Sequence, residues 1–229
     1  MIFDRLFSDD FRRRRLLAKA PAGPLRDYLS TPFPPLHQPA SGAAYLALDL
    51  ETTGGNPATD EIVSFGWVCM AGGRIDLASA RHRVVHLQGA MSSGSAVIHG
   101  ITDDECAQGG SLESALAELL SVLAGRVLIA HRAETELGFV GHACARIYGG
   151  RILIPAIDTL QIAIRRAQRK QQALQRGTLR LPALRSHYNL PRYPLHNALT
   201  DALSAAELFL AQQAEAMADA PLKDWLFRQ

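Results

Sequence analysis

Tyr45-Leu-Ala-Leu-Asp-Leu-Glu-Thr-Thr-Gly54 is the stretch around which the rest of this sequence is organised. Its apolar residues predict a buried strand, and two carboxylates, Asp49 and Glu51, interrupt it two positions apart. Residues i and i+2 of a strand point to the same face, so both carboxylates should project from one side of a sheet at the end of a strand.

Two neighbouring anions raise each other's pKa, and a divalent cation removes that conflict. Hard cations such as Mg²⁺ take oxygen ligands from one or two carboxylates and add water and substrate phosphates. A strand end with two solvated acids is the alternative, which an isolated Asp-x-Glu does not exclude. The following turn, with Thr52, Thr53 and two glycines, favours ligand binding because it offers hydroxyl and backbone N–H groups to a phosphate.

The composition sets broad limits on the fold and the setting. The chain has 229 residues, 48% of them hydrophobic, which is enough for one substantial core or one domain with an appendage. A net charge of +2 predicts no particular partner, and without an apolar run of about twenty residues we expect no membrane span. Cys69, Cys106 and Cys144 are too widely spaced for a disulfide framework or zinc site, which fits a reducing, cytoplasmic setting.

Residues 1–40 differ in character from residues 41–229, and we expect a domain boundary between them. A short helix starting near residues 8–10 should lead into an extended strap over the proline-rich residues 21–39. The run Arg12-Arg13-Arg14-Arg15 lacks the apolar segment of a targeting peptide. It could hold phosphates or form a solvated helix face.

The next segments predict a meander of strands. Residues 62–68 are apolar and β-branched enough for a second strand, and residues 74–86 for a third. Gly72-Gly73 between them is a two-residue hairpin signal.

The second half of the chain alternates between predicted helices and strands. Ser111 should cap an amphipathic helix, and the apolar residues 126–131 should form a strand that runs into a helix over 137–148. Residues 152–160 predict a last strand, residues 202–217 a last helix, and Trp225 to Phe227 an apolar tail on the core.

The motifs at both ends of this region resemble one enzyme family. The segment from Asp49 to Gly54 resembles the first motif of the DnaQ-like 3′-to-5′ exonucleases, the DEDDh family of polymerase proofreading subunits, RNase T and oligoribonuclease. The segment from His196 to Ala202, with Asp201 five residues after the histidine, resembles the last motif. The resemblance spans about residues 43–215 and implies an α/β ribonuclease-H-like fold with a five-stranded mixed sheet flanked by helices.

The second motif departs from the family pattern His-Asn-Ala-x-Phe-Asp. This chain reads His131-Arg-Ala-Glu-Thr-Glu136, so Glu136 stands at the position of the aspartate and Arg132 at that of the asparagine. Glutamate keeps the charge and adds one methylene, roughly 1.3 to 1.5 Å of reach. The helix could sit slightly farther back, or the metal geometry could differ. Glu134 is a poorer candidate because it lies about 200° around the helix from Glu136.

Three other features have two interpretations each. The segment around His99 resembles the element that lines the family's terminal-nucleotide pocket, although a lone histidine could simply satisfy a turn. Asp158 could be a catalytic acid, but we expect it to cap the next helix. The arginine-rich residues 164–180 could follow a nucleic-acid backbone or form a solvated surface.

The resemblance implies a two-metal mechanism. Two Mg²⁺ or Mn²⁺ ions about 3.5 to 4 Å apart would be held by four acids, and His196 would be the general base near neutral pH. The reaction would release nucleoside 5′-monophosphates from the 3′ end of single-stranded DNA or short oligonucleotides. The four acids are Asp49, Glu51, Glu136 and Asp201.

A nucleic-acid-binding module or polymerase accessory subunit with weakened catalysis is the competing hypothesis, and it rests on Arg132, Glu136 and the basic arm. Within the enzyme class, both proofreading and scavenging of short oligonucleotides or dinucleotides are open. The sequence does not separate DNA from RNA or long from short substrates. It leaves a polymerase partner and a homodimer equally open.

Overall fold

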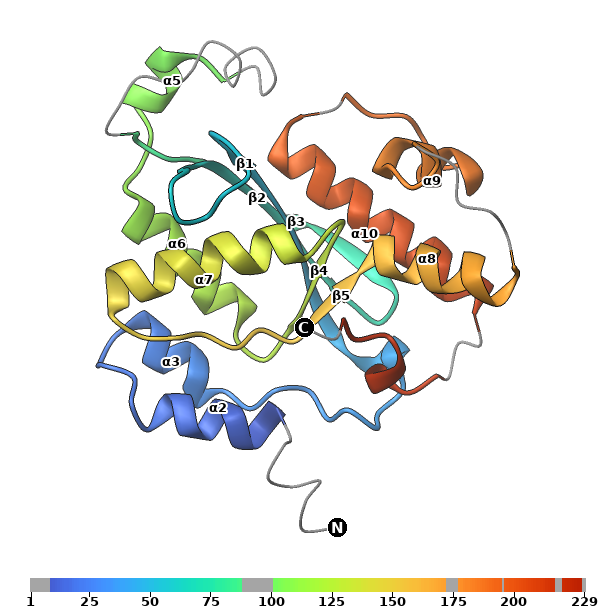
Figure 1. Cartoon of the computed structure of the whole chain (residues 1–229), viewed down its shortest axis with the longest axis horizontal. Helices are drawn as coiled ribbons and strands as arrows, with labels where there is room; N and C mark the ends of the chain where they lie inside the picture. The colour runs from blue at the N-terminus through green and yellow to red at the C-terminus, as the bar shows by residue number, and fades with distance from the viewer. Residues whose placement is uncertain (1–8, 88–100, 172–176, 195, 217–219, 228–229) are drawn as a thin grey trace.

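The structure, a computed structural model, describes residues 9–87, 101–171, 177–194, 196–216 and 220–227. Its centre is one sheet of five strands in the order β3-β2-β1-β4-β5 (Figure 1). β1 and β3 pair antiparallel with β2, whereas β4 pairs parallel with β1 and β5 parallel with β4. The five-stranded mixed sheet is therefore confirmed. The strands are β1 (Ala44–Thr52), β2 (Ile62–Ala71), β3 (Arg74–Val84), β4 (Val127–Ala130) and β5 (Ala156–Asp158).

Helices cover both faces of the sheet (Figure 1). α6 and α7 pack on one face with α2 and α3 beneath them, and α10 packs on the other face with α8 and α9. In the described part of the chain, no helix is both long and apolar enough to cross a membrane. The helices are α2 (Asp9–Leu17), α3 (Pro24–Ser30), α5 (Asp103–Ala107), α6 (Leu112–Leu123), α7 (Glu134–Tyr148), α8 (Thr159–Arg169), α9 (Leu181–His187) and α10 (Ala198–Glu215).

Local sequence signals account for several of these elements. Gly72 and Gly73 have φ of 57° and 70°, the left-handed values of a tight hairpin turn, as predicted between β2 and β3. The Ser111 side chain accepts a hydrogen bond from the Ser114 N–H and so caps α6, also as predicted.

The two faces of β1 are buried in different cores. Leu46 and Leu48 belong to the core under α6 and α7, whereas Tyr45 and Ala47 belong to the core under α10. Because the odd-numbered side chains of β1 point toward α10, Asp49 continues that row toward the first turn of α10.

The last strand is shorter than the prediction of residues 152–160. β5 begins only at Ala156, because Pro155 has no N–H to give to the sheet. Its carbonyl still accepts a hydrogen bond from the Leu128 N–H at 2.9 Å. The residues before Pro155 instead run back beside α7 (Figure 1).

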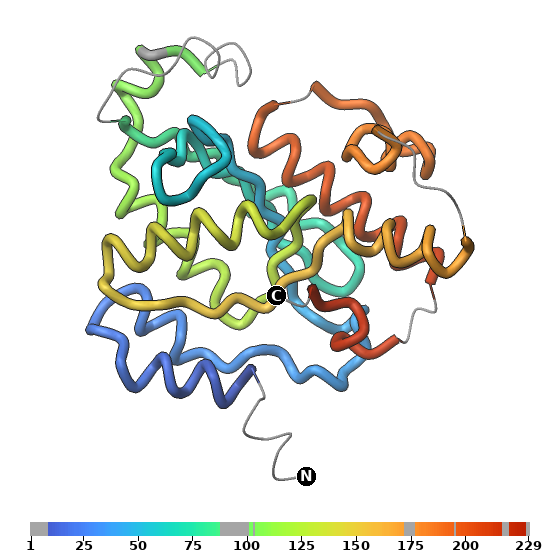
Figure 2. The backbone as a smooth tube through the Cα atoms, viewed as in Figure 1, coloured from blue at the N-terminus to red at the C-terminus, as the bar shows by residue number. Residues whose placement is uncertain are grey.

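The N-terminal arm packs onto the rest of the molecule beneath α6 and residues 149–155 (Figure 2). The buried Tyr28 donates a hydrogen bond to the Leu153 carbonyl at 3.0 Å. Arg13, only 4% exposed, donates to the Leu29 carbonyl and pairs with Asp10 at 2.7 Å. The arm thus contributes to the core, and a domain boundary at residue 40 stays a prediction.

One glycine controls how closely α10 approaches the sheet. Gly66 of β2 lies opposite Asp49 of β1, and a Cβ atom added to it would overlap the backbone of Ala198 and Leu199. The first turn of α10, which carries Asp201, therefore lies directly against the sheet beside Asp49. An isolated glycine within an apolar strand is the sequence signal for such an approach.

We expect Gly66→Ala to lower the free energy of unfolding by about 1 to 3 kcal/mol, because the added methyl group must displace the start of α10. Urea denaturation measures this change. Gly42→Ala is the matched control, since its added Cβ would meet no atom within 4 Å. Equal stability of the two variants would contradict the proposed close approach.

Candidate metal centre

Three carboxylates from two distant parts of the chain meet at one end of the sheet. Asp49 and Glu51 come from the end of β1, and Asp201 comes from the first turn of α10. One oxygen of each lies within 4.8 Å of the others. This proximity agrees with the prediction that Asp49 and Glu51 project from one side of the sheet.

The start of α10 is fixed by local hydrogen bonds. The Asn197 side chain caps the helix by accepting from the Thr200 N–H at 3.1 Å. The Asp201 carboxylate in turn accepts from the backbone N–H of His196 at 3.0 Å. The turn from His196 to Asp201 thus holds the third carboxylate toward β1.

Glu136 reaches the same site from the opposite layer. It lies in the first turn of α7 and is only 3% exposed, whereas Glu134 in the same turn is exposed. It is not one of the three acids within 4.8 Å of each other, but its charge acts strongly on Asp49. Because β4 ends at Ala130, the edge of β1 near Asp49 is open toward α7.

Burial and mutual repulsion disfavour the ionised forms of these acids. Burial, then the charges of Glu136, Asp201 and Glu51, raise the pKa of Asp49 well above its usual value. Burial and the Asp201 charge raise the pKa of Glu51 to about 7, and burial raises the pKa of Glu136 to about 8. Burial also raises the pKa of Asp201, opposed by the His196 N–H. A bound cation would relieve this repulsion.

The donor atoms fit a hard divalent ion. Oxygen Oδ1 of Asp201 and oxygen Oε2 of Glu136 are buried and have no hydrogen-bond partner among the residues that the structure describes. Buried polar atoms normally have partners, so these two atoms need a ligand. Carboxylate oxygens are the ligands that Mg²⁺ and Mn²⁺ prefer.

His196 lies at the exposed rim of the centre. Its φ of 64° is in the left-handed region, which is uncommon for residues other than glycine. Such strained residues are found most often at functional sites. The exposed side chain leaves the imidazole accessible from solvent, next to the carboxylate of Asp201.

Arg185 of α9, which sequence analysis did not single out, fastens the loop that leads to His196. Its guanidinium is buried and donates to the carbonyls of Pro191 and Ser204, each at 2.8 Å. It also pairs with Glu207 at 2.7 Å and lies 4.7 Å from the centre of the Tyr193 ring. The loop is thereby tied to α10, and its sequence carries no signal for this network.

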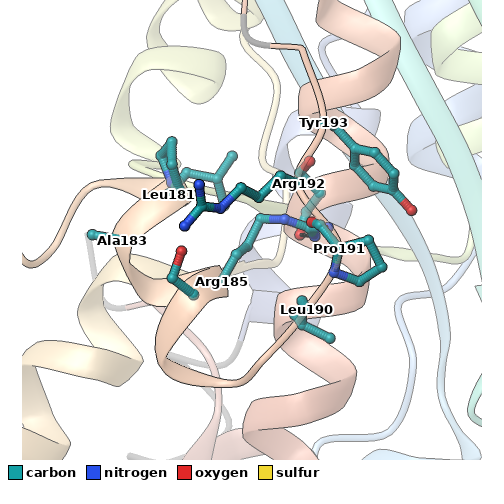
Figure 3. A pocket seen from close by; sticks show the side chains of 10 residues that line it. Leu181, Ala183, Arg185, Leu190, Pro191, Arg192 and Tyr193 are labelled. Atoms are coloured by element: carbon teal, nitrogen blue, oxygen red, sulfur yellow. Dashed lines mark hydrogen bonds between the residues drawn. The ribbon is translucent and has the colours of Figure 1, made fainter.

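Figure 3 shows this region, a cavity of about 400 Å³ between α9, the following loop and α10. The side chain of Arg185 points toward Pro191, and the side chain of Arg192 extends toward Leu181. Residues 190–193 of the loop that leads toward His196 line this cavity.

Asp158 connects the turn before α7 to the start of α8. Its carboxylate accepts from the Leu160 N–H at 2.9 Å, so its predicted capping role is confirmed. It also accepts from the Arg132 N–H at 3.0 Å. Arg132 has φ of 72°, a conformation that asparagine tolerates better than arginine.

The predicted phosphate-binding turn is tightly bonded within itself. The Thr52 hydroxyl donates to the Gly54 carbonyl at 2.7 Å, and the Thr53 hydroxyl accepts from the Glu61 N–H at 2.9 Å. Substrate binding by these threonines stays a prediction. His99, the other predicted substrate ligand, lies outside the described residues.

Part of the basic segment 164–180 has a structural role. Arg166 pairs with Glu215 at 2.6 Å and Lys170 pairs with the same carboxylate at 3.2 Å. Arg165 donates to the carbonyls of Asp224 and Trp225. These cations hold α8 to α10 and to the C-terminal turn, an arrangement that sequence analysis missed because Glu215 is distant along the chain.

The sequence comparisons agree with the motifs. The RNase_T family model, described as "Exonuclease", matches residues 46–209. The DNA polymerase III PolC-type of Thermotoga maritima is 30% identical over 168 residues, which cover 73% of this chain and 12% of that protein. The PolC-type polymerase of Staphylococcus haemolyticus is 25% identical and covers 78% of this chain, again over 12% of the relative. This chain therefore matches only a small part of those relatives.

The structural comparisons agree on the fold. The nuclease domain of 3'hExo, a DEDDh family member bound to rAMP, has a TM-score of 0.65 at 14% identity, covering 80% of this chain and 98% of that chain. E. coli Exonuclease I in complex with a 5cy-dT13 oligonucleotide has a TM-score of 0.64 at 14% identity, covering 80% of this chain and 43% of that chain.

The raised pKa values predict how the stability of the metal-free protein depends on pH. Glu51 and Glu136 ionise near 4.5 when unfolded but at about 7 and about 8 when folded. At a pH between the unfolded and the folded pKa, each carboxyl is ionised in the unfolded chain but still protonated in the folded protein. Their contribution to the free energy of unfolding is therefore highest below pH 4.5 and is lost as the pH rises toward 8.

We therefore expect Mg²⁺ to raise the melting temperature of the protein more at pH 8 than at pH 5, where protons compete for the carboxylates. Thermal denaturation with and without Mg²⁺ measures this. In the metal-free state Glu136→Gln should gain stability relative to the native protein as the pH rises. An equal Mg²⁺ shift at both pH values would argue against a site built from these acids.

Proposed function

Because the chain belongs to the exonuclease family described by the RNase_T model, we propose that it is a metal-dependent 3′-to-5′ exonuclease acting on single-stranded DNA or short oligonucleotides. The observation that carries this proposal is the meeting of Asp49, Glu51 and Asp201 within 4.8 Å, with the buried Glu136 acting on Asp49. Bound divalent cations would relieve this buried negative charge and keep the carboxylates ionised.

Asp49, Glu51, Glu136 and Asp201 would hold two Mg²⁺ or Mn²⁺ ions. When bound, such ions supply a nucleophilic water near neutral pH and neutralise charge on the leaving oxygen. The chain positions the ligands from two layers: β1 and α10 give three carboxylates, and α7 gives the fourth.

His196 is the proposed general base. Its backbone N–H donates to the Asp201 carboxylate, so the residue adjoins a proposed metal ligand, and its imidazole would take the proton without itself binding a metal. A neutral imidazole takes a proton readily near pH 7. The Arg185 network, which anchors the preceding loop to α10, would hold this histidine in place during turnover.

The turn with Thr52 and Thr53 is the proposed contact for the phosphate of the terminal nucleotide. The matched relatives are PolC-type polymerases, which favours a link to DNA synthesis and makes a polymerase partner a reasonable proposal. Scavenging of short oligonucleotides is the other role compatible with the same site. We also propose a reducing, cytoplasmic setting, because Cys69, Cys106 and Cys144 are widely spaced along the sequence.

We expect the purified protein with Mg²⁺ or Mn²⁺ to shorten a 5′-labelled single-stranded oligonucleotide stepwise, and His196→Ala to reduce the rate at least about 100-fold, because a general base contributes that much. Gel analysis of the products measures both results. His37→Ala, a change at an exposed histidine of the N-terminal arm, is the control and should keep full activity. Retained activity of His196→Ala would remove this histidine from the mechanism.

We expect Glu136→Asp to preserve or raise the activity, because it restores the usual acid of the family motif, and Glu136→Gln to lower it severely. Rates at saturating Mg²⁺ separate the two. If native protein and Glu136→Asp both bind oligonucleotides without hydrolysis, the chain is a binding module. An active Glu136→Gln variant would show that another acid serves.

A further inference from the structure

A groove runs along α7 away from the metal centre. Its cavity of about 530 Å³ is lined by α7 on one side and by residues 152–154 and Phe227 on the other. Gly138 and Gly141 form part of the α7 wall, and a Cβ atom added to Gly141 would meet nothing within 4 Å. The groove therefore has an open floor where an extended chain can approach the helix backbone.

One end of this groove lies at the first turn of α7. Glu134, which lines it, lies in that turn about 200° around the helix from the proposed metal ligand Glu136, so the groove and the metal centre lie on different sides of the start of α7. A Cβ added to Gly138 would be 3.0 Å from the Pro57 side chain, so the turn that follows β1 borders the groove here. A strand whose end lies in the metal centre would therefore pass around the first turn of α7 to enter the groove.

A basic cavity adjoins the groove at Ile152. This second cavity, of about 500 Å³, shares Ile152 with the first. Four cations line it. Arg12 and Arg15 belong to α2, Lys19 lies in the turn after α2, and Arg151 lies in the segment after α7. The spacing of three residues places Arg12 and Arg15 on one side of α2, and Lys19 follows in the turn after the helix.

These cations are poorly neutralised. No acid lines the basic cavity among the described residues, and only Arg12 has an ion pair there, with Asp9 at 3.3 Å. Arg13 and Arg14, by contrast, pair with Asp10 and point elsewhere. The arginine run thus divides into a structural part and a part that presents positive charge to a cavity.

We propose that the groove and the basic cavity together bind the upstream part of a single-stranded nucleic acid whose 3′ end lies in the metal centre. The proposal rests on the proposed exonuclease function. Phosphates would lie on the four cations, independently of base sequence, and Phe227 offers an aromatic surface for a base. Glu134, the one acid in either lining as described, lies at the end nearest the metal ions.

The length of α7 sets the size of the bound strand. From Glu134 to Gly149 the helix rises about 22 Å at 1.5 Å per residue. At about 3.4 Å per stacked nucleotide this distance corresponds to about six nucleotides. A trinucleotide in the metal centre therefore cannot reach the basic cavity, whereas a 20-nucleotide strand can.

The test measures the binding of 5′-labelled 20-mer and 3-mer single strands by fluorescence anisotropy. EDTA is present, so that no hydrolysis occurs. The triple variant Arg15→Glu, Lys19→Glu, Arg151→Glu should weaken 20-mer binding about tenfold or more and leave 3-mer binding unchanged. Its salt dependence should also fall by a slope of about 2, or about 0.7 for each of three phosphates. All three side chains are exposed, so the variant should fold.

Arg74→Glu, Arg81→Glu, Lys223→Glu is the control, with the same change in net charge at exposed positions outside both cavities. Gly141→Phe tests the groove without changing charge, and should weaken binding of the 20-mer alone. Equal losses in the control, or unchanged 20-mer binding in both test variants, would overturn the proposal. The proposal would also be overturned if the triple variant lost binding to phosphatidylserine vesicles while its binding of the 20-mer stayed unchanged.

Binding of the 20-mer does not require turnover, so the two proposals fail separately. Length-dependent binding without hydrolysis in Mg²⁺ would keep the strand path and remove the exonuclease function. If the native protein and the triple variant hydrolysed each substrate, the 20-mer and the 3-mer, with equal kcat/KM, the exonuclease function would be kept and the strand path removed.

Discussion

The close contact between α10 and strand β2 at Gly66 is the constraint on which the candidate metal centre depends. Any side chain at Gly66 would overlap the backbone of Ala198 and Leu199, so the helix start lies directly on the sheet beside Asp49. That contact brings Asp201 to the end of β1 although about 150 residues separate them along the sequence. A helix held one side-chain layer farther away would leave the acids of β1 without their third partner.

The same closeness concentrates negative charge where little water reaches it. Burial raises the pKa of all four acids. The effect is opposed at Asp201 by the N–H and side chain of His196 and by Arg185, and at Glu136 by its own backbone N–H and by Arg132. Two residues that border the acids, Arg132 and His196, hold left-handed backbone conformations. Strained backbone and unrelieved charge at one place are the expected features of a site completed by metal ions and substrate.

α7 links this centre to the rest of the surface. Its first turn supplies Glu136, its middle forms the wall of a groove, and the segment that follows it lines a cavity together with the cations of α2. The fold gives the basic residues that stand out in the sequence two different roles. Arg13, Arg166 and Lys170 hold helices in place through Asp10 and Glu215, whereas Arg12 and Arg15 line a cavity.

The sequence by itself determined the features that depend on neighbours along the chain. The two-residue period of β1 put Asp49 and Glu51 on one face, the paired glycines made the β2–β3 hairpin, and Ser111 and Asp158 capped their helices. Only the tertiary structure decided which distant groups meet: Gly66 with Ala198, Glu136 with Asp49, Arg185 with Glu207, and α2 with Arg151. Periodicity, turns and caps are local, whereas these contacts depend on how two layers of helices settle on the sheet.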